Sequence, residues 1–219
     1  MNIGGFQKLS ATDFPGRICS LVFTGGCLFR CSYCSNTEFV TAPQHSALNE
    51  EQIVAYLARH KKVINGVCIT GGEPTMQVRL IDFIKKIREL GLDIKLDTNG
   101  IHPEVLNELI QDKLVDYIAM DLKAPWIKYS SVFKKGAHMS IEKCREAFSL
   151  IQNSGLDHEF RTTIFPEIHS EEDFYEMASY LRDGEKYYIQ NFLNQSDFEV
   201  PSLVTGLRNR YPSLCIDER

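Results

Sequence analysis

The chain has 219 residues, of which 43% are apolar, and this length is sufficient for one sizeable hydrophobic core. Its formal net charge of −5 argues against non-specific nucleic-acid binding, which requires a basic surface. No apolar stretch approaches the roughly 20 residues of a membrane-spanning helix, and the N-terminus lacks the pattern of a secretion signal. We therefore expect a cytoplasmic protein with one domain over residues 1–219 that binds neither nucleic acid nor membranes.

Short apolar runs alternate with amphipathic helical patterns along almost the whole chain. Strands are predicted at residues 18–23, 67–70, 93–97, 117–121, 160–165 and 187–192. Helices are predicted after Asn49, around Leu80, from Pro103, from Ser140 and after Ser170, and a last helix and short strand complete the chain. Such alternation is typical of a parallel sheet with right-handed crossovers.

Capping signals mark several helix boundaries. Asn49, followed three residues later by Gln52, indicates a helix start, and the helix around Leu80 is expected to end at Leu90 with Gly91 as its C-terminal cap. A complete eightfold barrel needs about 250 residues. Six units in 219 residues therefore predict an α/β fold, a partial (β/α)6 TIM-like barrel whose parallel sheet is open on one side. An open side would admit a large substrate.

The polar motifs of the sequence follow the predicted strands, and in such barrels the active site lies at the carboxyl ends of the strands. A cysteine-rich run follows the first strand, and the segments 70–74, 97–100 and 121–125 end or follow the next three. Arg161 lies on the fifth strand and Gln190 on the sixth. We expect these side chains to share one rim.

Three of the seven cysteines, Cys27, Cys31 and Cys34, form a C-x3-C-x2-C pattern on one short loop. A [4Fe–4S] cluster has four irons, so three thiolates leave one iron open to another ligand, as catalytic metal sites do. Zinc is the alternative, because thiolates also bind zinc, and His45 is then the nearest downstream candidate for a fourth ligand. The other cysteines are scattered, which indicates buried free thiols rather than a disulfide framework.

The cysteine loop, with Tyr33 before the third cysteine, resembles the C-x3-C-x-aromatic-C hallmark of the radical S-adenosylmethionine (SAM) superfamily. The run Gly71-Gly72-Glu73-Pro74 resembles the GGEP segment of the same superfamily. The resemblance implies that the cysteines hold a [4Fe–4S] cluster whose open iron SAM chelates, and that the GGEP segment binds the methionine amino group. Glycines let a ligand approach the backbone closely, and a carboxylate accepts hydrogen bonds from an ammonium group.

Within the superfamily, the sequence resembles the activating proteins of glycyl-radical enzymes. Their motifs are matched by the segments 5–10, 12–17, 97–100 and 121–123 and by Arg161 with Pro166. The likeness is closest to the activating proteins of anaerobic ribonucleoside-triphosphate reductase, and pyruvate formate-lyase activating enzymes are near relatives. One departure is Ser35, which stands where many activating enzymes have a histidine.

Further roles follow from this resemblance alone. It implies contacts with SAM from Tyr33, Asp97, Asn99, Lys123, Arg161 and Gln190. It also implies a monovalent cation beside SAM, held by Asp13, Asp97 and Asp121. Three carboxylates on one rim would repel one another unless a cation lay among them.

The implied activity is reductive cleavage of SAM at the cluster, which yields a 5′-deoxyadenosyl radical that takes a hydrogen from a glycine of a large partner enzyme. The resemblance points to anaerobic ribonucleotide reductase as that partner and to flavodoxin or ferredoxin as the low-potential electron donor. The alternatives are activation of pyruvate formate-lyase or another glycyl-radical enzyme, and a small-molecule radical SAM enzyme. A third alternative, from a different class, is a non-enzymatic iron–sulfur electron-transfer module.

Overall fold

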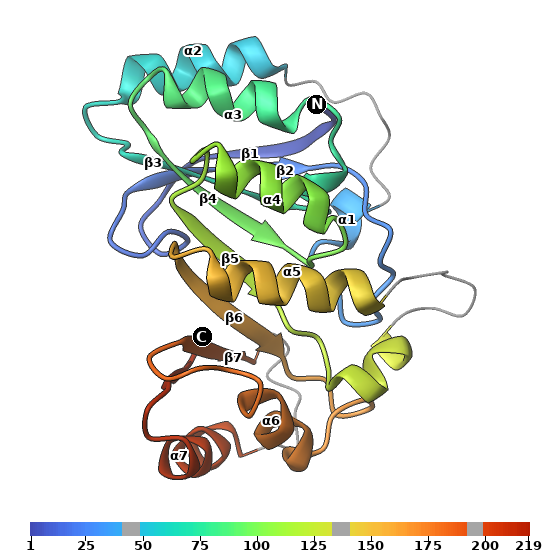
Figure 1. The fold of residues 1–219 in the computed structure, drawn as a ribbon. Helices are drawn as coiled ribbons and strands as arrows, with labels where there is room; N and C mark the ends of the chain where they lie inside the picture. Colours follow the sequence, from blue (N-terminus) through green and yellow to red (C-terminus); the bar gives the residue numbers. More distant parts are fainter. Residues whose placement is uncertain (41–48, 133–140, 192–198) are drawn as a thin grey trace.

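The computed structural model describes residues 1–40, 49–132, 141–191 and 199–219, and its strands form one open sheet (Figure 1). The strands are β1 (Ile3–Ser10), β2 (Cys19–Thr24), β3 (Gly66–Gly71), β4 (Asp93–Thr98), β5 (Tyr117–Asp121), β6 (Asp157–Thr163), β7 (Lys186–Gln190) and β8 (Cys215–Glu218). Their order in the sheet is their order in the chain. β1 pairs antiparallel with β2, and each later strand pairs in parallel with the one before it.

Helices connect the parallel strands, and α4 and α5 lie over one face of the sheet (Figure 1). The α-helices are α1 (Thr37–Val40), α2 (Glu50–His60), α3 (Leu80–Arg88), α4 (Pro103–Gln111), α5 (Ile141–Asn153), α6 (Glu171–Ala178) and α7 (Val200–Arg210). Two short 3-10 helices, η1 (Pro74–Met76) and η2 (Trp126–Val132), follow β3 and β5. In the described ranges, no helix has both the length and the apolar character needed to cross a membrane.

The two faces of the sheet differ in chemistry. Ile69, Leu96 and Met120 belong to the face that packs into the main hydrophobic core. The side chains that alternate with them on the other face include Lys95 and Asp97 on β4, Asp121 on β5, and Glu159 and Arg161 on β6. Strands of a parallel sheet are normally apolar on both faces, so this polar inner face indicates where the chemistry of the protein lies.

The predicted partial barrel with an open parallel sheet is confirmed, and each predicted strand occurs with boundaries shifted by up to three residues. β1 was not predicted, because the run Ile3–Ser10 contains two glycines and no continuous apolar segment. It can form a strand because it lies at the sheet edge, where most of its side chains remain exposed or half-buried. Ser140, the predicted start of a helix, lies outside the described residues, and α5 is described from Ile141.

The structure confirms the predicted helix cap at Asn49. The Asn49 side chain accepts a hydrogen bond from the Gln52 backbone N–H at 2.8 Å, and the Gln52 side chain accepts one from the Asn49 N–H at 3.3 Å. This reciprocal pair satisfies two N–H groups that a helix start leaves without partners. α3 ends at Arg88, slightly before the predicted end, and Gly91 adopts the expected left-handed conformation with a φ of +77°.

Replacing Asn49 by alanine should therefore lower the free energy of unfolding by about 1 kcal/mol, because the cap to α2 is lost. Chemical denaturation of both proteins measures this difference. The control is Asn107→Ala on the exposed face of α4, which should cause no loss, since alanine has the higher helix propensity. Equal losses in both variants would contradict the capping role.

Candidate functional site

A cavity of about 350 Å³ lies where the loops after β2, β3, β4 and β5 meet the inner face of the sheet. The structure brings almost all predicted site residues to its wall, namely Asp13, Cys27, Cys31, Tyr33, Cys34, Gly71, Gly72, Glu73, Asp97, Asn99, Asp121, Lys123, Arg161 and Gln190. Pro74 is the exception, since it is buried as the first residue of η1. The predicted residues thus share one rim, although they come from seven separate segments of the chain.

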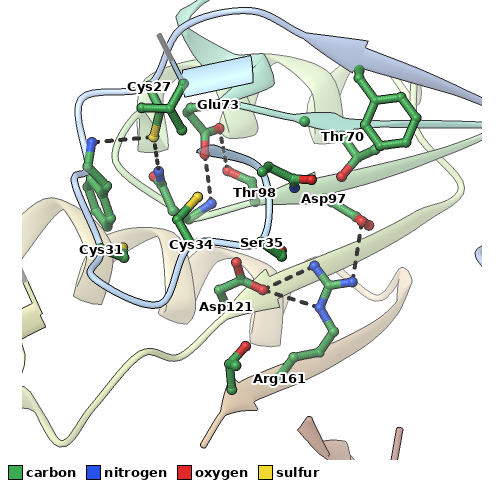
Figure 2. Close-up of a pocket in the computed structure, with 18 of the residues that line it drawn as sticks. Cys27, Cys31, Cys34, Ser35, Thr70, Glu73, Asp97, Thr98, Asp121 and Arg161 are labelled. Carbon is green, nitrogen blue, oxygen red and sulfur yellow. Dashed lines mark hydrogen bonds and ion pairs between the residues drawn. The ribbon is translucent and has the colours of Figure 1, made fainter. Parts of the chain in front are cut away.

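The three cysteines are half-buried and lie on the loop between β2 and α1 (Figure 2). Burial raises the pKa of the Cys27 thiol to about 12, the nearby Glu73 carboxylate adds to this effect, and burial also raises the pKa of Cys31. Binding a metal at these sulfurs would therefore release protons. Three thiols on one cavity wall supply the donor set of an iron–sulfur cluster with one open iron.

The described residues of this loop do not form a coordination site for a single zinc ion. Across the described ranges, no three Cys, His, Asp or Glu side chains converge on a point where one ion would sit, and this includes the three cysteines. His45, the fourth ligand considered for zinc, lies outside the described residues. Three thiolates are also the donor set of a cluster that leaves one iron open, whereas a structural zinc site needs four ligands.

Glu73 is fully buried, and its side chain joins two segments of the chain (Figure 2). One carboxylate oxygen accepts from the N–H of Thr75 at 3.1 Å, from its hydroxyl at 2.6 Å and from the Thr98 hydroxyl at 2.8 Å. The other oxygen accepts from the Asn99 N–H at 2.8 Å. Burial raises the pKa of Glu73, while these hydrogen bonds lower it in part. The Glu73 side chain therefore connects the loop after β3 to the end of β4 by hydrogen bonds. Its contact with the SAM amino group stays a prediction.

The two glycines before Glu73 are needed for packing as well as for a ligand. The N–H of Gly72 donates to the Thr24 carbonyl and the N–H of Glu73 donates to the Gly26 carbonyl, each at 2.8 Å. A Cβ atom on Gly72 would collide with that Gly26 oxygen, and Gly71 has a φ of +102°. The GGEP loop thus packs directly against the residue that precedes Cys27.

Arg161 lies between the two carboxylates predicted to share the rim (Figure 2). Its guanidinium is 3.3 Å from the Asp97 carboxylate and 3.1 Å from the Asp121 carboxylate. Lys95 contacts Asp97 at 2.6 Å, and Lys123 contacts Asp121 at 3.0 Å. Burial raises the pKa of Asp97, but Arg161 and Lys95 outweigh this effect and hold it at about 2. Both carboxylates are therefore ionised and compensated by protein cations.

The predicted monovalent cation site is only partly assembled by these side chains. Asp97 and Asp121 lie together, whereas the Asp13 carboxylate accepts a hydrogen bond from the Ser10 hydroxyl. The positive charge among the carboxylates comes here from Arg161. The cation site stays a prediction.

Tyr33 and Lys123 are held by a residue that the sequence did not single out for the site, His169. The Tyr33 ring packs 5.1 Å from the Phe165 ring, and its hydroxyl lies 3.5 Å from the Lys123 carbonyl oxygen. His169 is buried; its Nδ1 accepts from the Phe165 N–H at 3.1 Å, and its Nε2 donates to the same Lys123 carbonyl at 2.8 Å. These bonds fix a neutral imidazole between the loops after β5 and β6.

Other residues around the site were also missed: Thr98 lines the cavity, and Lys95 and Glu159 lie on the same polar face of the sheet. Glu159 is fully buried and accepts from the Tyr117 hydroxyl at 2.7 Å and from the Arg219 guanidinium at 2.6 Å. A signal was present in the run Asp93–Asp97, where charged residues alternate with Ile94 and Leu96. A buried parallel strand should be apolar throughout, so alternation of this kind indicates a polar interior.

Residues 21–181 match the radical SAM superfamily. A protein of Methanocaldococcus jannaschii, provisionally named as a glycyl-radical enzyme activating enzyme, is 33% identical over 87% of this chain and 79% of its own length. The pyruvate formate-lyase-activating enzyme of Clostridium pasteurianum is 27% identical over 98% of this chain and 87% of its own. Among solved structures, SuiB of Streptococcus suis, in complex with the precursor peptide SuiA, superposes with a TM-score of 0.69 at 14% identity. The match covers 91% of this chain but only 48% of the SuiB chain, and at this identity it speaks for the fold alone.

The open parallel sheet, with three cysteines and a glycine-rich loop on one cavity wall, defines an enzyme that works with a cluster and a bound cofactor. The matched residues extend this to a family: the chain belongs to the radical SAM superfamily. Its cofactors are therefore a [4Fe–4S] cluster and SAM, and the alternative of a non-enzymatic electron-transfer module is wrong.

The buried histidine predicts a pH effect on stability. Burial lowers the pKa of His169 below its usual value of about 6.5, so its contribution is complete above that pH and is lost as the pH falls. His169→Gln should lower the free energy of unfolding by about 1–3 kcal/mol at pH 7.5, because buried partners lose their bonds. The loss relative to the wild type should shrink by pH 5, as measured by urea unfolding.

His158 is the matched control, because its pKa shifts the other way. Burial lowers the pKa of His158, but the hydrogen bond to Glu185 outweighs this effect and raises it. The stability that His158 contributes is therefore complete at low pH and is lost as the pH rises. His158→Gln should cost more at pH 5 than at pH 7.5. The same trend in both variants would contradict the assignment of a neutral His169.

Proposed function

We propose that this enzyme activates a glycyl-radical enzyme by forming a radical on a glycine of that partner. The observation that carries the proposal is the placement of Cys27, Cys31 and Cys34 beside the GGEP loop, on a cavity of an open sheet. Support comes from the relatives named above, which are activating enzymes and match this chain over most of its length.

The residue roles proposed for this reaction follow the cavity wall. Cys27, Cys31 and Cys34 would hold the cluster, and the backbone of Gly71 and Gly72 would face the methionine amino group. Further around the wall, SAM would meet Tyr33, Glu73, Asp97, Asn99, Lys123, Arg161 and Gln190, with Asp13 and Asp121 beside them. With both cofactors bound and an electron supplied, they provide the 5′-deoxyadenosyl radical.

The protein itself contributes to the proposed reaction a cavity wall whose side chains are held in place and whose charges are balanced. Arg161, Lys95 and Lys123 keep the carboxylates of Asp97 and Asp121 ionised, so these two carboxylates need no proton movement when SAM binds. Tyr33 and His169 hold the backbone at Lys123 in place. Positioning of this kind is what a protein adds to cofactor chemistry.

The open sheet supports a macromolecular substrate. The described strands end in two unpaired edges, β1 and β8, so the barrel does not close around the cavity. A glycine within a loop of a large enzyme would reach the radical through such an opening. We propose anaerobic ribonucleoside-triphosphate reductase as that enzyme, on the motifs at residues 5–10, 12–17, 97–100 and 121–123. Pyruvate formate-lyase is the alternative, and a flavodoxin or ferredoxin would supply the electron.

Removal of one cluster ligand should abolish SAM cleavage. We expect Cys31→Ser to fold, to bind little iron and to form no 5′-deoxyadenosine when reduced with dithionite under anaerobic conditions, because three thiolates are needed. Chromatography quantifies the product. The control is Cys215→Ser, since Cys215 is exposed and lies outside the cavity. Cleavage at the wild-type rate in Cys31→Ser would exclude a cluster held by this loop.

The identity of the partner is tested by incubating the reconstituted enzyme with SAM, a reductant and either anaerobic ribonucleotide reductase or pyruvate formate-lyase. We expect a glycyl-radical EPR signal with the reductase and a weaker one or none with the lyase. A signal with the lyase alone would reassign the partner. Turnover of a free metabolite, with no radical on either protein, would favour a small-molecule radical SAM enzyme instead.

A further inference from the structure

A side-chain amide at the end of β4 is directed at one cysteine sulfur. The Asn99 Nδ2 atom lies 3.6 Å from the Cys27 Sγ atom, and the Phe29 backbone N–H donates to the same sulfur at 3.3 Å. Within the described ranges, no side-chain donor reaches the sulfur of Cys31 or Cys34, and the Cys31 thiol has its own backbone N–H as a donor. The three ligand sulfurs are therefore not equivalent, because among the described residues only Cys27 of the three accepts a side-chain N–H group.

The orientation of the Asn99 amide is determined by its neighbours. Its Oδ1 accepts from the Ile101 N–H at 3.0 Å, so the NH2 end must face the sulfur. Its backbone N–H donates to Glu73 at 2.8 Å, and the side chain is buried. Both the position and the direction of the donor are thus fixed before any cluster binds.

A hydrogen bond to a ligand sulfur acts on the redox equilibrium of a cluster. Reduction adds one negative charge, part of which lies on the thiolate ligands, and an N–H donor stabilises that charge. Hydrogen bonds to the sulfurs are among the terms that set cluster potentials, as outer contacts tune metal sites in general. A buried donor is more effective than an exposed one, because water does not compete for it.

We propose that the Asn99 amide raises the reduction potential of the [4Fe–4S] cluster by donating a hydrogen bond to the Cys27 thiolate. Glu73 is then a positioning residue for this donor, because it holds the Asn99 backbone. The proposal rests on the cluster at the three cysteines and is independent of which partner enzyme is activated. A failed search for a glycyl-radical partner would leave it intact.

The test is an EPR-monitored redox titration of the reconstituted protein. Asn99→Asp retains an acceptor for the Ile101 N–H but turns a carboxylate oxygen toward the sulfur. Its cluster should be harder to reduce, with the ratio of reduced to oxidised cluster at a fixed potential falling about tenfold, or about 59 mV for one electron. Asn99→Ala should shift in the same direction by less. Asn107→Asp, on the exposed face of α4, adds the same charge and should leave the potential unchanged.

The proposal would be overturned if the cluster of Asn99→Asp or of Asn99→Ala, once loaded, had the same reduction potential as the cluster of the wild type. An equal shift in Asn107→Asp would also overturn it, since the effect would then be one of net charge. If neither Asn99 variant holds a cluster, resonance Raman spectra of the wild type decide. The iron–cysteine stretching modes should shift on exchange into D2O when N–H donors contact a ligand sulfur, and modes that do not respond to exchange would again exclude the bond.

Discussion

The rest of the site depends on the hydrogen bonds that the buried carboxylate of Glu73 accepts. Glu73 accepts four hydrogen bonds from Thr75, Thr98 and Asn99, while its own N–H is bonded to Gly26 beside the first cysteine. A buried carboxylate is stable only when such donors compensate for the loss of water. Because the donors come from different segments, this compensation also fixes the loop after β3 relative to the end of β4, and the backbone bond from Glu73 to Gly26 adds the cysteine loop.

Charge balance on the inner face is the second constraint. Asp97 and Asp121 would repel each other, yet Arg161 contacts both, and Lys95 and Lys123 each contact one of them. Removing one partner from such a network leaves an uncompensated buried charge, which is strongly destabilising. The network therefore replaces an apolar barrel interior by a rigid polar wall, and we propose that SAM, which is charged, binds against this wall.

Sequence reasoning succeeded where the signal is local. Six strand–helix units, the Asn49 cap and the cysteine spacing are all properties of short segments, and the structure agrees with each. It failed for β1, whose strand state depends on pairing with β2 at the sheet edge. It also missed His169, because the hydrogen bond that His169 donates to the Lys123 carbonyl joins residues that no local pattern connects.

The sequence by itself determined the class of fold and the donor set, because hydrophobic period and cysteine spacing are encoded within a few residues. It did not determine which groups those donors contact. That Gly72 packs against Gly26, that Arg161 bridges two carboxylates and that Asn99 faces Cys27 were decided only by the register of parallel strands. The physical reason is that pairing in a parallel sheet brings the carboxyl ends of distant strands to one edge, where burial allows only complementary polar groups to meet.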